Sequence, residues 1–277
     1  MIIKEYNLTS HDGLKLYTRS WSCQDKPVAV ICLIHGMGEH SGRYNHLGEF
    51  FAERNIAIVA IDLRGHGKSE GKKGHSPEYE FLIKDISALI DNTKELFPDI
   101  PLILYGHSLG GSLVLSYSLD KPKDVNIIVV TSPWIRLAFE PPKVKVKLAT
   151  MLGKLLPAFS QNTGLNPYHL SQNPSVGKDY IKDKLVHDKI SVSMYLGILD
   201  AGNEIISRKD LGLPCLLLHG SDDKITSWPA SQEFANNNNN VNYKLWDGYY
   251  HELHNEDDKD KIMEYIYTWI IKKADLN

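Results

Sequence analysis

The sequence predicts an α/β fold, a mostly parallel sheet flanked by helices. Two wholly or largely apolar runs, residues 28–34 and 56–61, are typical of strands buried on both faces of a sheet. Segments with helical periodicity alternate with such runs from residue 28 to 131. Because strands that alternate with helices form parallel sheets with right-handed crossovers, we expect a mostly parallel sheet of eight strands.

The expected elements begin with a hairpin, because residues 2–8 and 14–21 alternate around Asp12-Gly13, a strong hairpin signal. A long amphipathic helix over 78–97 is stopped by Pro98. The other expected strands are 28–34, 56–61, 102–105, 125–131, 215–219 and 243–246, and the other expected helices are 44–54, 112–119, 229–235 and 258–273.

An inserted segment interrupts this alternation between residues 134 and 207. Prolines punctuate several helical pieces there, among them Pro157, Pro167 and Pro174. We expect a helical cap over the carboxyl edge of the sheet, the edge at which open α/β folds bind ligands. The remaining residues, 1–133 and 208–277, are then the core of the fold.

Composition excludes some classes of function. The net charge of −3 over 277 residues gives no indication of the basic surface that nucleic-acid binding requires. Of the three cysteines, Cys32 and Cys215 lie in apolar runs and are expected to be reduced core residues. The N-terminus does not resemble a signal peptide and no apolar run is long enough to span a membrane, so we expect a cytoplasmic protein.

The motif that indicates chemistry is Gly106-His107-Ser108-Leu109-Gly110, a G-x-S-x-G sequence between an expected strand and an expected helix. At such an elbow the serine hydroxyl is exposed on a strained turn, and the amides of the following helix face any negative charge that develops beside it. A glycine-rich turn with an incidental serine would show the same letters, but rarely between a strand and a helix. Ser108 is therefore the candidate nucleophile.

A serine nucleophile needs a histidine to take its proton and an acid to orient that histidine. After the strand at 215–219 the sequence has two histidines, His251 and His254. His251 directly follows the last strand and its Asp-Gly turn, and is the expected base. Asp222 and Asp223 both follow the strand at 215–219. The usual G-x-x-D spacing from Gly220 favours Asp223.

Donors for an oxyanion are expected from two backbone amides, that of Leu109 and that of Met37 in the loop after the strand at 28–34. A zinc site is the alternative to consider, because residues 251–254 read H-E-x-H and residues 35–40 read H-x-x-x-E-H. Neither spacing matches a zinc-hydrolase motif. We expect neither a metal nor another cofactor.

Beyond these residues, the chain resembles the monoacylglycerol lipase and lysophospholipase group of α/β-hydrolases. The specific match is residues 35–44, His-Gly-Met-Gly-Glu-His-Ser-Gly-Arg-Tyr, which is similar to the H-G-x-G-E-H-S-x-R-Y signature of that group. Residues 62–71, the elbow and the segments 220–223 and 250–256 also fit. The resemblance implies an α/β-hydrolase fold and hydrolysis of a monoacylglycerol or a similar single-chain lipid ester by Ser108, Asp223 and His251.

The resemblance also implies residues at the polar end of the site. Glu39, Arg43 and a cap tyrosine lie there in the family, and that tyrosine corresponds to Tyr180. Three residues beyond His251, His254 is close enough to line the same site. The cap is the least similar region: Lys184 stands where the family has a proline.

The cap sequence suggests a contact with lipid. Apolar residues at helical spacing, with Pro141-Pro142 suited to starting the helix, form one face and three lysines form another. This face either only packs on the core or also borders the acyl tunnel and transiently contacts a membrane surface. The apolar residues are Val144, Leu148, Met151, Leu152, Leu155, Leu156 and Phe159, and the lysines are Lys143, Lys147 and Lys154.

Other functions share the same residues. A short-chain carboxylesterase, a lysophospholipase or an aminopeptidase-like acyl hydrolase would carry the same triad. A non-catalytic binding protein on this fold would be expected to lack the serine, the histidine or the oxyanion loop, and this chain keeps all three. The sequence does not indicate an oligomeric state.

Overall fold

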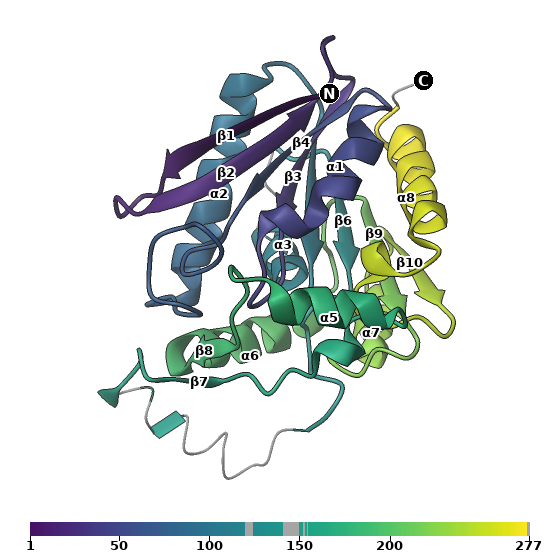
Figure 1. Ribbon diagram of the computed structural model, residues 1–277. Coiled ribbons are helices and arrows are strands. Elements are labelled where there is room, and N and C mark those ends of the chain that lie inside the picture. Colours follow the sequence, from purple (N-terminus) through teal and green to yellow (C-terminus); the bar gives the residue numbers. More distant parts are fainter. Residues whose placement is uncertain (120–123, 141–149, 152, 154, 276–277) are drawn as a thin grey trace.

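One eight-stranded sheet forms the centre of the molecule (Figure 1). The computed structural model describes residues 1–119, 124–140, 150–151, 153 and 155–275. Strand order is β1-β2-β4-β3-β5-β6-β9-β10; β1–β2 and β2–β4 pair antiparallel and all later pairs are parallel. The predicted α/β fold with a mostly parallel sheet of eight strands is confirmed. The strands are β1 (Ile2–Thr9), β2 (Lys15–Ser22), β3 (Ala29–Ile34), β4 (Ile56–Ile61), β5 (Leu102–His107), β6 (Ile127–Thr131), β9 (Cys215–Gly220) and β10 (Val241–Trp246).

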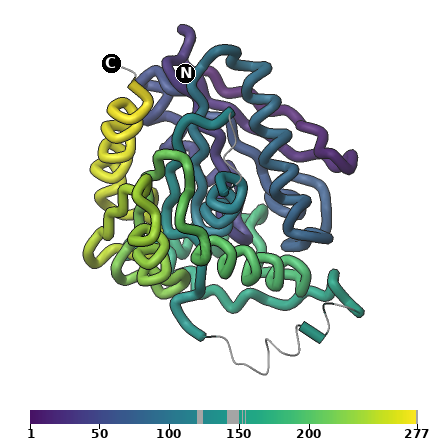
Figure 2. The backbone as a smooth tube through the Cα atoms, turned by 180° about the vertical axis from the view of Figure 1, so that it is seen from behind, coloured from purple at the N-terminus to yellow at the C-terminus, as the bar shows by residue number. Residues whose placement is uncertain are grey.

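Helices cover both faces of the sheet, and Figure 2 shows the face that Figure 1 hides. One hydrophobic cluster packs α1 and α8 on one face, and a second packs α2, α3, α6 and α7 on the other. The helices are α1 (Asn45–Ala52), α2 (Tyr79–Leu96), α3 (Leu109–Leu119), α5 (Pro174–Lys182), α6 (Val192–Ser207), α7 (Trp228–Asn236) and α8 (Lys259–Lys273), with short 3₁₀ turns η1 (Ser41–Tyr44), η2 (Pro167–His169) and η3 (Leu253–Asn255).

The central strands are apolar throughout because each one serves both clusters. In β5, Leu102 and Leu104 join the cluster under α2 and α3, whereas Ile103 and Tyr105 join the one under α1 and α8. This is the two-residue period of a strand with helices on both faces. β5 is thereby fixed at the centre of the sheet, and its carboxyl end carries the elbow.

The segment between β6 and β9 lies across the carboxyl edge of the parallel strands (Figure 1). Besides α5 and α6 it contains a two-stranded antiparallel ribbon, β7 (Ser160–Asn162) with β8 (Lys189–Ser191). The sequence did not predict this ribbon, because three-residue strands are too short to show a period. Much of the predicted first cap helix, Pro141–Pro142, Lys143, Val144, Lys147, Leu148, Leu152 and Lys154, lies outside the described residues.

Among the helices that the structure describes, none is both long enough and apolar enough to cross a bilayer.

Candidate active site

Ser108 lies on the turn between β5 and α3 with a backbone φ of 54°, a left-handed conformation that non-glycine residues seldom adopt. The turn is held from both sides: the Ser108 amide donates to the Thr131 carbonyl of β6, and the Ser108 carbonyl accepts from the Trp134 amide, each at 3.0 Å. Gly110 must be glycine, because a Cβ there would come within 2.1 Å of the Ile34 carbonyl oxygen. These contacts fix the strained turn that presents the Ser108 hydroxyl.

Asp223 and His251 meet from neighbouring loops. Asp223 follows β9, His251 follows β10, and these two strands are adjacent and parallel. The Nδ1 of His251 lies 2.7 Å from the Oδ2 of Asp223. Because a carboxylate can only accept, Nδ1 carries the proton and donates it to Asp223, which leaves Nε2 as the basic atom of the neutral ring. Asp222, the alternative acid, is exposed on the same turn.

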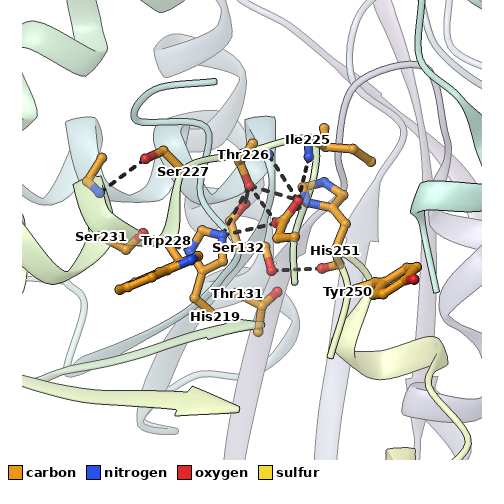
Figure 3. A network of polar contacts seen from close by, with 12 residues as sticks. Thr131, Ser132, His219, Ile225, Thr226, Ser227, Trp228, Ser231, Tyr250 and His251 are labelled. Carbon is orange, nitrogen blue, oxygen red and sulfur yellow. Dashed lines mark hydrogen bonds and ion pairs between the residues drawn. The ribbon is translucent and has the colours of Figure 1, made fainter. Parts of the chain in front are cut away.

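The environment of Asp223 keeps its carboxylate ionised. Its other oxygen, Oδ1, accepts from the amides of Ile225 and Thr226, both labelled in Figure 3, at 2.7 and 3.0 Å. Burial opposes ionisation, but the His251 charge and the hydrogen bonds of His219 and His251 hold the pKa of Asp223 well below its usual range. Burial likewise disfavours the protonated ring of His251, but the charge and the hydrogen bond of Asp223 favour it and raise the pKa of His251. The pair therefore stabilises a positive charge on His251.

The loop after β3 lies next to the elbow that carries Ser108. The Gly36 amide donates to Oε1 of Glu39 at 2.7 Å, so it is already committed within the loop. Met37 is the next amide and lines the same cavity as Ser108. Leu109 opens α3, where first-turn amides have no intrahelical acceptor. The Met37 and Leu109 amides are thus the candidates for an oxyanion site.

A buried ion-pair network lies behind this loop. Arg43 donates to Oε2 of Glu39 at 2.7 Å and forms two hydrogen bonds with the carboxylate of Glu252 at 2.5 and 2.7 Å. Burial alone would raise the pKa of Glu252, but the Arg43 guanidinium lowers it to about 2. The guanidinium also stacks over the ring of Tyr180 from α5, 4.9 Å from its centre. Arg43 therefore links the oxyanion loop, the His251 loop and the cap.

His254 is placed differently from the expectation that it lines the site. It is 1% exposed, and its ring stacks on that of Tyr44 at 4.6 Å and meets that of His107 edge-on at 4.8 Å. Burial is the main reason that the pKa of His254 falls to about 3. In the part of the chain that the structure describes, His254 and Arg43 are absent from the cavity wall. The 3₁₀ turn η3 directs His254 inward, behind the cavity.

A cavity of about 270 Å³ opens beside Ser108 and His251. Small-molecule sites typically span roughly 300–1,000 Å³, so this one is small. Glu39, His107, Glu252 and Tyr180 form one polar part of its wall, and further polar side chains come from Gln161, Thr163, Asn166, His169 and Lys224. Apolar side chains make up much of the rest: Met37, Trp134, Leu137, Phe139, Leu165, Leu170, Ile190, Tyr195 and Ile225.

His107 and Glu252 line the cavity, although sequence analysis gave neither of them a role. Carboxylate and imidazole atoms of Glu39, His107 and Glu252 lie within 4.8 Å of one another, an arrangement that could in principle hold a metal ion. The Arg43 guanidinium already compensates both carboxylates. Glu252 was noted only within H-E-x-H and within the segment 250–256, without a role of its own, and no local pattern links it to Arg43. For His107 the signal was its position within G-x-S-x-G.

Comparison with known proteins places these features in a wider group. Residues 25–258 match the family model described as "Serine aminopeptidase, S33". The chain is 41% identical over 275 residues to an uncharacterized abhydrolase domain-containing protein of Dictyostelium discoideum, of whose length it spans 29%. It is 28% identical to the monoacylglycerol lipase of Mycolicibacterium smegmatis, with 96% of each protein covered.

Solved structures agree with this grouping. The monoacylglycerol lipase of Paleococcus ferrophilus shares 32% identity and superposes with a TM-score of 0.85, over 93% of this chain and 99% of the other. A soluble variant of the Saccharomyces cerevisiae monoglyceride lipase, solved with a substrate analogue, gives a TM-score of 0.87 at 20% identity, which bears on the fold alone. That pair covers 99% of this chain and 96% of the other.

Proposed function

Because the chain belongs to the serine aminopeptidase S33 family of α/β-hydrolases, we propose that it is a serine esterase of single-chain lipids, with Ser108, His251 and Asp223 as its triad. The preferred reaction is cleavage of a monoacylglycerol to a fatty acid and glycerol. The observation that carries this proposal is the 2.7 Å contact between His251 and Asp223 at the cavity that Ser108 lines.

In the proposed mechanism, Nε2 of His251 takes the hydroxyl proton as Oγ of Ser108 attacks the ester carbonyl. The amides of Leu109 and Met37 stabilise the negative oxygen of the tetrahedral intermediate. The C–O bond of the ester then breaks and His251 gives its proton to the departing alcohol. Water, deprotonated by His251, then attacks the carbonyl of the acyl-enzyme. The bond to Oγ of Ser108 breaks, His251 returns the proton to Oγ, and the fatty acid is released.

The cavity supports a substrate with one apolar chain and one polar end. Its wall is largely apolar, whereas Glu39 and Glu252 place hydrogen-bond acceptors at one end. A glycerol hydroxyl can donate to such acceptors. The relatives from Mycolicibacterium smegmatis and Paleococcus ferrophilus carry the name monoacylglycerol lipase. A phospholipase of Bacillus subtilis, 28% identical over 245 residues, makes lysophospholipids the substrates to compare.

The test is a substrate series with a matched inactive variant. Hydrolysis of monoacylglycerols from octanoyl to oleoyl is compared with that of lysophosphatidylcholine, nitrophenyl butyrate and an aminoacyl amide. Monoacylglycerols should give the highest kcat/KM, and Ser108→Ala should abolish both turnover and labelling by a fluorophosphonate probe. Labelling that persists in Ser108→Ala excludes Ser108 as the nucleophile. If another class of substrate is hydrolysed with a higher kcat/KM, that class replaces monoacylglycerols as the proposed substrate.

Transient contact of the cap with a membrane is part of the same proposal. Phe139 lines the cavity and is 57% exposed, so apolar surface continues from the cavity to the outside. Leu155 and Leu156 of the cap are 79% and 53% exposed. Exposed apolar side chains on the cap of a lipid esterase would let an acyl chain leave the bilayer without crossing water.

Vesicle binding tests this contact. Leu155→Glu and Leu156→Glu should weaken sedimentation with phosphatidylglycerol-containing vesicles and leave hydrolysis of nitrophenyl butyrate intact. Leu96→Glu is the matched control, because Leu96 is a 45% exposed leucine at the end of α2. If the cap variants bind vesicles as strongly as the control, this face does not contact lipid.

A further inference from the structure

The candidate acid Asp223 is shared by two histidines. Besides Nδ1 of His251 at 2.7 Å, Oδ2 of Asp223 has Nε2 of His219 at 3.0 Å. His219 comes from β9, four residues before Asp223, and is fully buried. In Figure 3 the two rings approach the Thr226 hydroxyl from different sides. No sequence motif singled out His219.

The hydrogen bonds around His219 define its tautomer. Asp223 can only accept, so Nε2 of His219 carries a proton and donates it. The opposite nitrogen, Nδ1, lies 2.9 Å from Oγ of Ser231 on α7. In a neutral ring this Nδ1 must accept, so the Ser231 hydroxyl donates to it. The chain of donors therefore runs from Ser231 through His219 to Asp223.

The Thr226 hydroxyl completes this arrangement without replacing His219. Its oxygen lies 2.9 Å from Oδ2 of Asp223 and 3.1 Å from the Ser132 carbonyl, and it has one proton to give. It is also 3.3 Å from both imidazoles. When it donates to Ser132, His219 is the second side-chain donor that Oδ2 retains beside His251.

We propose that His219 is a positioning residue for the triad and that Ser231, by its hydrogen bond to Nδ1, keeps the His219 ring oriented toward Asp223. The inference rests on the proposed function, in which Asp223 orients His251. The Oδ1 atom is fixed by the amides of Ile225 and Thr226, and His219 gives Oδ2 a second imidazole donor besides His251. With both oxygens held, the carboxylate cannot rotate away while His251 gains and loses its proton. Buried charge-assisted hydrogen bonds are the stronger kind, so this restraint is effective.

The experiment compares His219→Leu, which removes the donor, with His219→Gln, whose amide nitrogen can take the place of Nε2. On a water-soluble ester, His219→Leu should lower kcat by roughly ten- to a hundredfold and leave KM within about twofold, because the loss of one hydrogen bond to a charged group is felt at the base. His219→Gln should restore most of the loss. A purely structural role would not be rescued by an amide.

Ser231→Ala tests the orientation of the His219 ring separately. Without the serine donor, Nδ1 of His219 loses its partner and the ring is held less firmly toward Asp223. Ser231→Ala should therefore lower kcat several-fold in the wild-type background and have no effect in His219→Gln, whose amide does not depend on Ser231. Equal effects in both backgrounds would overturn the assignment. Ser231→Ala also provides the test if His219→Leu does not fold.

Downfield proton NMR separates this inference from the proposed function. The Nδ1 proton of His251 and the Nε2 proton of His219 should each give a resonance in the wild-type protein, whatever its substrate. His219→Leu should remove one resonance and shift the other, and Ser231→Ala should broaden or move the His219 signal. An unshifted His251 resonance in His219→Leu overturns the positioning role. Absence of fluorophosphonate labelling in the wild type, with both shifts present, overturns the proposed function instead.

Discussion

Replacing Arg43 by methionine should leave two buried carboxylates without their cation. The Arg43 side chain is 10% exposed, and those of Glu39 and Glu252 are 3% and 2% exposed. Methionine keeps much of the volume and removes all three hydrogen bonds. Breaking a buried ion pair by removing one partner typically costs about 3–5 kcal/mol, since the remaining charge stays buried. We expect Arg43→Met to lower the free energy of unfolding at pH 7 by about this amount.

The pKa of Glu252 gives a second measure of the same interaction. It is lowered from an ordinary 4.5 to about 2, and each unit corresponds to about 1.4 kcal/mol, so the environment favours the ionised form by about 3 kcal/mol. Because the folded-state value is the lower one, this stabilisation is present above about pH 4.5 and is lost as the pH falls toward 2. The difference between wild type and Arg43→Met should therefore shrink over that range.

Urea unfolding followed by tryptophan fluorescence measures both effects. Arg136→Met is the control, because the Arg136–Glu233 pair has side chains that are 51% and 46% exposed, and exposed pairs contribute about 0–1 kcal/mol. Adding Glu252→Gln to Arg43→Met should recover part of the loss, since it removes one unpaired charge. A cost for Arg43→Met that equals the control and does not vary with pH would refute the reasoning.

Two further predictions concern the triad. Asp223→Asn should keep the fold and lose roughly 10⁴ in kcat, because an amide can turn its NH₂ toward His251 and favour the wrong tautomer of that ring. Asp222→Asn should lose little kcat. Steady-state kinetics of the two variants test this ranking, and the reverse ranking would make Asp222 the acid. Because Asp223 raises the pKa of His251 above its ordinary 6.5, kcat/KM should fall with decreasing pH through a midpoint above 6.5. The residual activity of Asp223→Asn should show a lower midpoint, and a pH–rate profile that does not move would contradict this assignment.

The fold was predictable because its signals are local. Continuous apolar runs gave strands such as β3 and β4 with bounds close to the observed Ala29–Ile34 and Ile56–Ile61. Each run is buried on both faces, so its character does not depend on distant residues. The elbow was equally accessible, because the strand, Ser108 and the helix are consecutive in sequence. The β7–β8 ribbon was missed because its two strands have only three residues each, too few to show an alternation.

The surroundings of the triad were not predictable for the opposite reason. Arg43 and Glu252 are 209 residues apart, and nothing near either residue specifies the other. His254 looked like a site residue because it lies three positions after His251, yet it belongs to the 3₁₀ turn η3, where its ring is buried. His219 had the appearance of the end of a buried strand. Local sequence signals therefore identified the candidate triad residues better than the residues that contact them from distant parts of the chain.

The oxyanion loop shows how the cap and the core depend on each other. Gly38 has a φ of +79°, and a Cβ at this position would lie 2.4 Å from the carbonyl oxygen of His187 in the cap. The His187 amide in turn donates to the Gly38 carbonyl at 2.9 Å. The cap backbone thus packs directly on the residue that follows Met37, while Arg43 holds Glu39 on the other side. We therefore expect a displacement of the cap segment around His187 to reach the Met37 amide, which we propose as an oxyanion donor.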